Sequence, residues 1–276
     1  MTKYLLFAFL TLILTLSIAA AGLKRQEGSG VKFYSPYKGV YVVDVDAKAH
    51  PEYINIYLSE NLETVKEISE KNNAIAALNA GFFDPSNRKT TSYVTINNNT
   101  AANPEDNNHF MNNPELKPYL KQFLNRSEFR ILDCSGEIKF DIAPHQASSN
   151  GCSIKDSVQA GPELVPSLRL EEEAFVVRKN GKIIRQSAAA LSKFPRSAIG
   201  IKSGHIFLVE ISSENSANLP ELAKIMSKLG VEKAMAFDGG SSTSMYVNLP
   251  DSEKFILNSA KDNGARRVKS AVIIKN

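Results

Sequence analysis

The chain has 276 residues, with 33 Lys and Arg against 29 Asp and Glu and a formal charge of +4 at pH 7. The basic residues are spread along the chain rather than clustered, which excludes a nucleic-acid-binding surface. The four His and two Cys lack the spacing of a zinc site, and nothing in the sequence demands another metal or a cofactor. The length is sufficient to bury a full hydrophobic core.

The N-terminus has the pattern of an export signal. Lys3 precedes an apolar run over residues 5–16, and small residues follow at 19–22. We therefore predict a cleaved signal peptide over 1–21 and an exported protein, periplasmic or extracellular, with no stable membrane span after cleavage. An uncleaved N-terminal anchor is the alternative. Residues 22–35 are predicted to be a flexible N-terminal segment, and 36–276 to form the domain.

The first half of the domain reads as strands and one helix. Residues 39–45 and 53–58 have strand character, with alternating apolar and polar side chains in the second run. A helix is expected around Leu62, Val65 and Ile68, and a strand leads to Asn79. Residues 97–118 are rich in Asn and poor in aliphatic side chains, which predicts a long surface loop or lid inserted in the domain. A helical segment over 114–125 is expected to close it.

Hairpins dominate the second half. One is predicted over 129–142 around Ser135-Gly136, and another over 196–211 around Ser203-Gly204. Apolar residues at i, i+3, i+4 and i+7 from Leu222, with Pro220 before and Gly230 after, predict a helix. Residues 271–274 form a closing strand. These elements predict an α+β class: a single domain of mixed, largely antiparallel β-sheets with a few packed helices.

Cys134 and Cys152 are 18 residues apart in polar, turn-rich surroundings. In an exported protein this arrangement favours a disulfide bond between them, and two free thiols are the alternative.

Two strand-to-glycine junctions carry the chemistry. At 234–244 a small apolar run leads into Asp238, two glycines and four hydroxyl side chains. At 74–84 a similar run leads into Asn79, Gly81 and Asp84. Glycine turns let backbone N–H groups approach a ligand, so we expect one site built from two parts of the sheet.

Six motifs follow one another along the chain: NAGFF at 79–83, QAGPELV at 159–165, PRSAIGI at 195–201, the helix ending at Leu229-Gly230, AFDGGSSTSM at 236–245 and RRVKSAVII at 266–274. Together they resemble the phosphodiester glycosidase family over roughly residues 40–275. The resemblance implies a hydrolase that releases a sugar, such as N-acetylglucosamine, from a phosphodiester at its anomeric carbon. The substrate would be a phosphorylated glycan or glycolipid of the cell envelope.

Such a leaving phosphate is a weak base, so the reaction needs a cation and a carboxylate more than a strong acid. We assign Asp238 as nucleophile or base, Arg196 as the phosphate ligand, and Glu163 as a further catalytic carboxylate. The remaining predicted contacts are to substrate: Asn79, Gly81, Asp84, Gly161, Gly239, Gly240, Ser241, Ser242 and Thr243.

Alternatives remain open for several of these residues. Asn79 could equally satisfy backbone groups in its turn. His109 and His145, in loops, are expected to be solvated. Arg266 and Arg267 could line the phosphate side of the site, but a solvated pair is expected. At the level of function, a non-catalytic envelope module that binds phosphorylated glycans is the main alternative. An amidase using Ser241 or Ser242 is weaker, because no His lies near these residues in the sequence. The oligomeric state is left undetermined.

Overall fold

The computed structural model describes residues 26–259 and 265–276. The predicted signal peptide lies outside these residues. Within them, no helix is long and apolar enough to cross a membrane.

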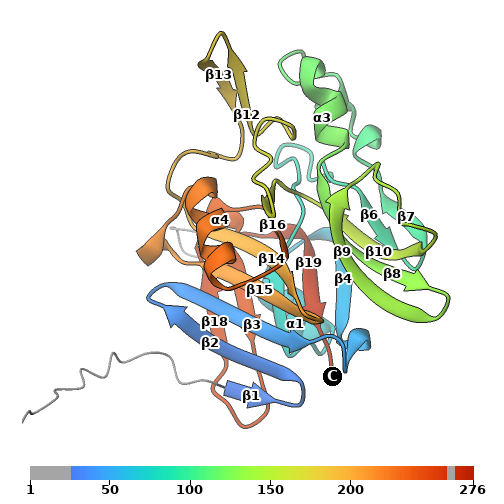
Figure 1. Cartoon of the computed structure of the whole chain (residues 1–276), viewed down its shortest axis with the longest axis vertical. Coiled ribbons are helices and arrows are strands. Elements are labelled where there is room, and N and C mark those ends of the chain that lie inside the picture. Colours follow the sequence, from blue (N-terminus) through green and yellow to red (C-terminus); the bar gives the residue numbers. More distant parts are fainter. Residues whose placement is uncertain (1–25, 260–264) are drawn as a thin grey trace, which may run out of the picture.

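Three antiparallel β-sheets form the framework of the fold (Figure 1). Sheet I has seven strands, in the order β1 (Gln26–Gly28), β2 (Val31–Tyr37), β3 (Val40–Asp46), β15 (His205–Ile211), β14 (Arg196–Lys202), β16 (Lys233–Ala236) and β11 (Glu163–Val165). Sheet II has five, β7 (Asn99–Ala102), β6 (Val94–Ile96), β10 (Ser153–Gln159), β8 (Ser127–Cys134) and β9 (Glu137–Pro144). Sheet III has five, β18 (Phe255–Asn258), β17 (Ser244–Val247), β5 (Ala76–Asn79), β19 (Val268–Ile274) and β4 (Ile54–Glu63).

A separate hairpin and a few helices complete the fold. The hairpin pairs β12 (Val176–Lys179) with β13 (Lys182–Gln186). The α-helices are α1 (Val65–Lys71), α2 (Asn108–Met111), α3 (Leu120–Leu124) and α4 (Leu219–Lys228). Short 3-10 turns lie at η1 (Pro51–Tyr53), η2 (Pro104–Asp106), η3 (Lys117–Tyr119), η4 (Ser213–Asn215) and η5 (Gly240–Ser242). This arrangement confirms the predicted α+β class and both predicted hairpins, β8–β9 and β14–β15.

The main core lies where the three sheets face one another. It contains Val43 and Leu208 of sheet I, Phe129 of sheet II and Leu78 of sheet III, all fully buried. Each such side chain contributes about 1.5–3 kcal/mol by leaving water. The apolar strands therefore meet in the middle of the molecule. The polar residues that follow the strand ends lie at the edges of the sheets, where a site can form.

Helices cover the outer faces of two sheets. The predicted helix at Leu222 is α4, whose Leu222 and Met226 pack on sheet I. The Asn218 side chain accepts from the Glu221 N–H, and the Glu221 carboxylate accepts from the Asn218 N–H, which caps the first turn. On sheet III, α1 buries Val65 and Ile68 and is capped in the same way by Thr64.

The N-terminal segment differs from the prediction. Residues 22–35 were expected to be flexible, but β1 begins at Gln26 and β2 at Val31. Val31 and Phe33 are fully buried in the main core, because β2 pairs with β3 and turns alternate side chains inward. The alternating run is short and follows polar residues, so the sequence pattern did not indicate a strand here.

The Asn-rich segment 97–118 also has more structure than the predicted loop. It contains β7, η2 and α2. Its asparagines act as caps: the Asn103 side chain accepts from the Glu105 N–H and the Asn107 side chain from the Phe110 N–H. Asn is favoured at such positions because its side-chain oxygen satisfies the free N–H groups of a helical turn. The helix expected over 114–125 is formed as η3 followed by α3.

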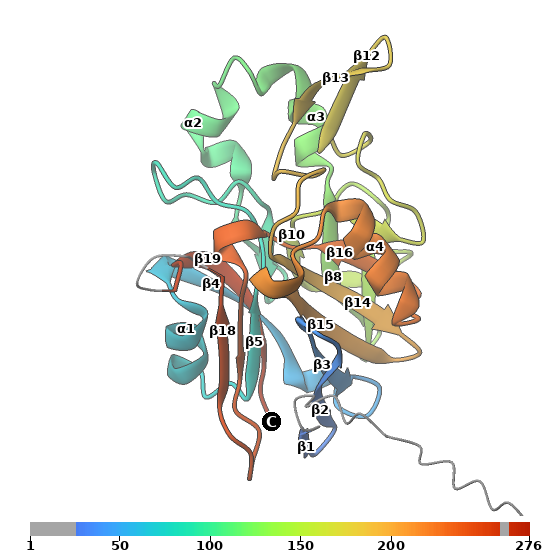
Figure 2. The ribbon, with the colours of Figure 1, turned by 90° about the vertical axis from the view of Figure 1, so that its left-hand side faces the viewer.

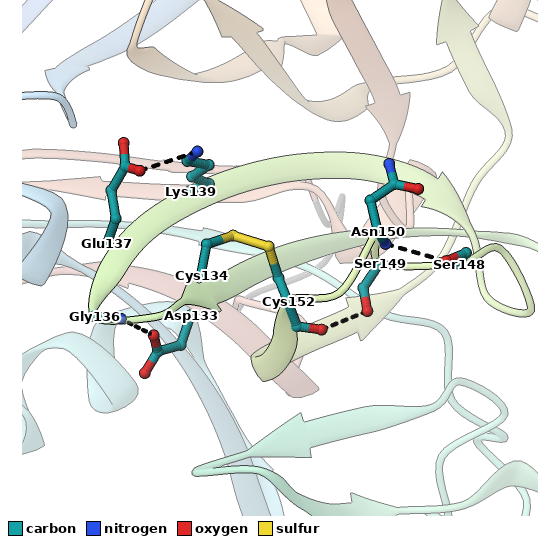
Figure 3. The surroundings of a disulfide bond; sticks show 9 residues. All are labelled: Asp133, Cys134, Gly136, Glu137, Lys139, Ser148, Ser149, Asn150 and Cys152. Atoms are coloured by element: carbon teal, nitrogen blue, oxygen red, sulfur yellow. Dashed lines mark hydrogen bonds and ion pairs between the residues drawn. A yellow bond between two sulfur atoms is a disulfide. The ribbon is translucent and has the colours of Figure 1, made fainter.

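The predicted disulfide is present between Cys134 and Cys152 (Figure 3). It joins the end of β8 to the residue preceding β10, in sheet II. The bond therefore closes a loop that contains all of β9.

Candidate active site

The turn after β16 is joined to the end of β5 by one buried side chain. The Asn79 amide nitrogen donates to the Asp238 carbonyl at 2.6 Å, and its oxygen accepts from the Ser197 hydroxyl at 2.6 Å and the Ser244 N–H at 3.1 Å. Both ends of the amide are engaged, and Asn79 is fully buried. Asn79 therefore positions the Asp238 turn between sheets I and III, the structural alternative stated above for this residue.

A cavity of about 350 Å³ opens beside this turn. Its lining includes Asp238, the 82–85 segment that follows β5, α2 with His109, Arg126, and Ser187 and Ala188 after β13. The hollows beside α4 and beside β9 contain none of the residues predicted for the site. Of the predicted residues, Asp238 and Asp84 thus meet in one concave surface although 154 positions separate them in the numbering.

Asp238 is the carboxyl group of this cavity with the most altered acidity. Burial raises its pKa to about 6, although the Ser242 hydroxyl, the Gly239 N–H and the charges of Arg266 and Arg196 act in the opposite direction. A carboxyl group with such a pKa exchanges its proton close to neutrality. Asp238 can therefore serve as a base or nucleophile near neutral pH.

Arg196 does not point its donors into the cavity. Its guanidinium donates to four backbone carbonyls, those of Ala217, Ala188, Ala189 and Ser192, at 2.8–3.0 Å. The side chain is almost completely buried. Arg196 holds the 188–192 loop beneath the Asp238 turn, so its geometry does not support the predicted role as phosphate ligand.

Arg126 is a cation that does line the cavity. Its Nε donates to the Glu173 carbonyl at 3.0 Å and one terminal nitrogen to the Ser187 hydroxyl at 3.2 Å. The guanidinium carbon lies 3.8 Å from the Phe175 ring centroid and 4.5 Å from that of Phe123. Burial lowers the pKa of Arg126 to about 9, so it stays charged at neutral pH. Its remaining N–H groups can bind an anion.

Arg266 is a second cation at the site. Its charge acts directly on Asp238, and its guanidinium lies over the Phe83 ring, 5.5 Å from the centroid. Its Nε is buried and has no hydrogen-bond partner among the described residues. The neighbouring Arg267 is different, because it is exposed and binds Glu67 and the Leu62 carbonyl. The solvated pair expected from the sequence is therefore divided, with only Arg267 at the surface.

Asp84 and His109 form a pair across the cavity mouth. The His109 Nδ1 lies 2.5 Å from the Asp84 carboxylate, and the Ser86 N–H binds the other oxygen at 2.8 Å. Burial alone would raise the pKa of Asp84, but these hydrogen bonds outweigh it and the pKa lies below the ordinary value. His109 is 62% exposed, so it is solvated as expected but also paired.

The predicted glycines mostly set the backbone. Gly161 has φ of +89°, and a Cβ there would lie 2.1 Å from the Glu173 carboxylate. The Gly240 N–H donates to the Pro195 carbonyl at 2.9 Å and the Gly81 N–H to the Ser270 hydroxyl at 3.0 Å. Only the Gly239 N–H is directed to the site, where it lies against the Asp238 carboxylate. These positions allow close packing, and none offers a donor to a ligand directly.

The hydroxyls after Asp238 have separate surroundings. Ser241 is exposed, Ser242 is buried against Asp238, and Thr243 is fully buried. The Thr243 hydroxyl has no partner among the described residues. Ser242 is therefore the hydroxyl that influences the carboxyl group. Within the described residues the four His pair with acids, namely Glu52, Asp84, Glu128 and Asp44, and none forms a hydrogen bond with Ser241 or Ser242.

Glu163 lies outside the cavity. Its carboxylate is 3.8 Å from Arg169, and burial raises its pKa. Glu173, which was not predicted, is instead the buried acid next to Arg126: its carboxylate accepts from the Ser127 hydroxyl at 2.7 Å and the Glu163 N–H at 2.9 Å. The catalytic role predicted for Glu163 is thus without support from its position.

Comparison with known proteins identifies the family of the chain. Residues 72–275 match the family model described as phosphodiester glycosidase. Because the match covers most of the chain, the protein belongs to the phosphodiester glycosidase family. No curated protein matches the sequence.

Solved structures share the fold. The catalytic domain of zebrafish N-acetylglucosamine-1-phosphodiester alpha-N-acetylglucosaminidase, auto-inhibited by its pro-peptide, superposes with a TM-score of 0.60 at 14% identity, over 89% of this chain and 77% of that one. A hypothetical Synechocystis protein gives 0.58 at 17%, over 91% of this chain and 61% of that one, so this chain spans about three-fifths of its length. A Burkholderia pseudomallei protein assigned as exported gives 0.52 at 14%, over 88% and 74%.

Sequence reasoning missed Arg126 and Glu173. Arg126 stands alone between a predicted helix and a hairpin, and its partners Glu173 and Phe175 are 47 and 49 positions away. No local pattern marks such a residue. For Arg266 a signal existed, because it opens one of the six family motifs.

Proposed function

We propose that the protein is exported and hydrolyses a sugar-1-phosphodiester, of the N-acetylglucosamine-1-phosphodiester kind, in an envelope glycan or glycolipid. The observation that supports this best is the cavity at the Asp238 turn. There, a carboxyl group with a pKa of about 6 lies within reach of the charge of Arg266, and Arg126 lines the same cavity. A carboxylate and fixed cations are the two requirements for breaking a sugar–phosphate bond.

In the proposed reaction the bond between the anomeric carbon and the phosphate oxygen breaks. Its electron pair leaves with the phosphate monoester, whose negative charge Arg126 and Arg266 would neutralise. The Asp238 carboxylate either attacks the anomeric carbon or removes a proton from the attacking water. In both cases the oxygen of water ends on the sugar. The anomer first released, read by NMR, distinguishes the two routes.

The walls of the cavity are compatible with a sugar ring. Phe82 and Phe83 line it together with Pro85. The apolar face of a pyranose packs well on an aromatic ring, and its hydroxyls would face Asp84, His109 and Thr91. This supports a glycan rather than a simple phosphodiester as substrate.

Export has independent support. The Cys134–Cys152 disulfide is typical of proteins that fold outside the cytoplasm. The chain also begins with the residue pattern of a signal peptide.

The test is sugar release from a panel of sugar-1-phosphodiesters, including one of N-acetylglucosamine. We expect release by the wild type and by Asp251→Asn, a control at an exposed acid, and a loss of at least about a thousandfold in Asp238→Asn. Full activity in a folded Asp238→Asn protein would reject the role of Asp238. Tight binding of the panel without release by the wild type would favour the glycan-binding module.

A further inference from the structure

The β12–β13 hairpin carries an unusual surface. Between Val176 and Gln186 it has four basic residues, Arg178, Lys179, Lys182 and Arg185, and no acidic one. Ile183 and Ile184 are 44% and 55% exposed, and among the described residues they are the one pair of neighbouring large apolar side chains left in solvent. Such a combination of exposed apolar and basic residues requires an explanation.

The tip of the hairpin is compact, and its two lysines form no salt bridge with a described residue. Asn180 and Gly181 both have positive φ, 52° and 76°, as a tight two-residue turn requires. Lys179 pairs with Lys182 across the strands, and the register shift beyond Ile183 leaves Ile184 as a bulge. Arg178 is neutralised by Glu171 at 3.1 Å, whereas neither lysine has an acidic partner in the part of the chain that the structure describes.

The base of the hairpin is anchored next to the active-site cavity. Val176 is buried, and Val177 packs on the cluster of Phe110, Phe123 and Ala174. Phe110 also lines the cavity, as does Ser187, the residue that follows β13. Figure 2 shows the hairpin projecting from the same end of the molecule as α2 and α3. The exposed tip therefore lies at the end of the molecule that carries the cavity.

We propose that the β12–β13 tip docks on an anionic lipid surface. Ile183 and Ile184 would enter the boundary between headgroups and acyl chains, and Lys179 and Lys182 would bind lipid phosphates. The pairing of β12 with β13 satisfies the backbone groups that face the partner strand, which lowers the cost of leaving water for this part of the tip. Docking would hold the cavity close to the membrane, where a lipid-linked sugar phosphodiester could reach it; this last consequence alone rests on the proposed function.

The test is sedimentation with vesicles of equimolar phosphatidylcholine and phosphatidylglycerol, and with vesicles of phosphatidylcholine alone. The chain from Gly22 is used, because it retains every described residue and removes the apolar N-terminus. We expect binding to the anionic vesicles that falls with added salt. Lys179→Ala/Lys182→Ala should weaken it about thirtyfold, and Ile183→Ser/Ile184→Ser at least about tenfold.

Matched controls lie on other surfaces. Lys224→Ala/Lys228→Ala on α4 and Ile256→Ser on β18 should leave vesicle binding unchanged. No binding by the wild type, or equal losses in the controls, would overturn the proposal. If the lysine variant fails but the isoleucine variant binds normally, surface charge alone explains the binding, and the proposed entry of Ile183 and Ile184 into the bilayer is wrong. Release of sugar from a water-soluble substrate should be the same in all these proteins, which separates this result from the fate of the proposed function.

Discussion

At the residue scale, the raised pKa of Asp238 gives the proposed reaction a pH profile. Only the carboxylate form can attack or act as a base, and burial raises the pKa to about 6. We expect kcat/KM to fall as the pH drops below about 6 and to level off above it. Rates on a phosphodiester substrate at several pH values check this. A flat profile through that range, with the fold intact, would contradict the assignment.

Glu210 on β15 is a buried acid away from this chemistry. It is fully buried, neither carboxyl oxygen has a partner among the described residues, and burial raises its pKa well above the ordinary value. An acid with a raised folded pKa destabilises the fold as pH rises, because the unfolded state releases the proton more easily. We expect Glu210→Gln to be about 1–3 kcal/mol more stable at alkaline pH, with a smaller gain at acidic pH. Urea unfolding at two pH values measures this; an equal effect at both would refute it.

Individual residues also mark the limit of prediction from sequence. The Asp238 turn was recognisable because strand, acid and glycines are consecutive. The role of Arg196 was not, because its partners are backbone carbonyls, which no residue type marks. Three of them, at Ala188, Ala189 and Ser192, lie in the loop just before it, and the fourth is at Ala217. An arginine in a sequence motif indicates a functionally or structurally required charge. Its hydrogen-bond partners in the folded protein decide whether that charge binds substrate or holds the backbone.

At the scale of elements, the disulfide closes the loop around β9. The bond spans 18 positions, so in the chain-entropy model its loss lowers the free energy of unfolding by about 3 kcal/mol. We expect Cys134→Ser/Cys152→Ser to unfold at a clearly lower denaturant concentration. Wild type measured with and without reductant is the control, and the reduced wild type should match the double variant. An unchanged midpoint would show that the loop is restrained by the β8–β9 pairing alone.

Long periodic elements were predictable and short ones were not. Helix α4 was predictable because its apolar residues recur with the helical period. Both hairpins were predictable because each has two apolar runs around a turn signal. β2 was missed because few residues alternate before Tyr37, and its burial depends on pairing with β3. In the Asn-rich segment, composition suggested a loop, whereas the asparagines cap short helical turns.

For the whole molecule, Asn79 links two sheets through one amide. It connects β5 to Ser197 on β14 and to Ser244 on β17, and it holds the Asp238 carbonyl. Asn79→Ala would leave these buried groups unpaired, at a cost of about 2–4 kcal/mol, and would release the Asp238 turn. We expect lower stability together with a lower kcat. Thermal unfolding and sugar release, compared with Asn87→Ala at a partly exposed amide, check this; a loss of stability with unchanged kcat would show that the turn is held by other contacts.

Strand β8 separates the candidate active site from the disulfide bond. It begins directly after Arg126 at the cavity and ends at Cys134, eight residues later, which is about 25 Å. A change in the redox state of the surroundings thus acts far from the reacting atoms. A reduced molecule would be expected to turn over substrate normally while it remains folded, and to be lost sooner to heat and proteases. An oxidising environment would then determine how long each molecule works and not how fast.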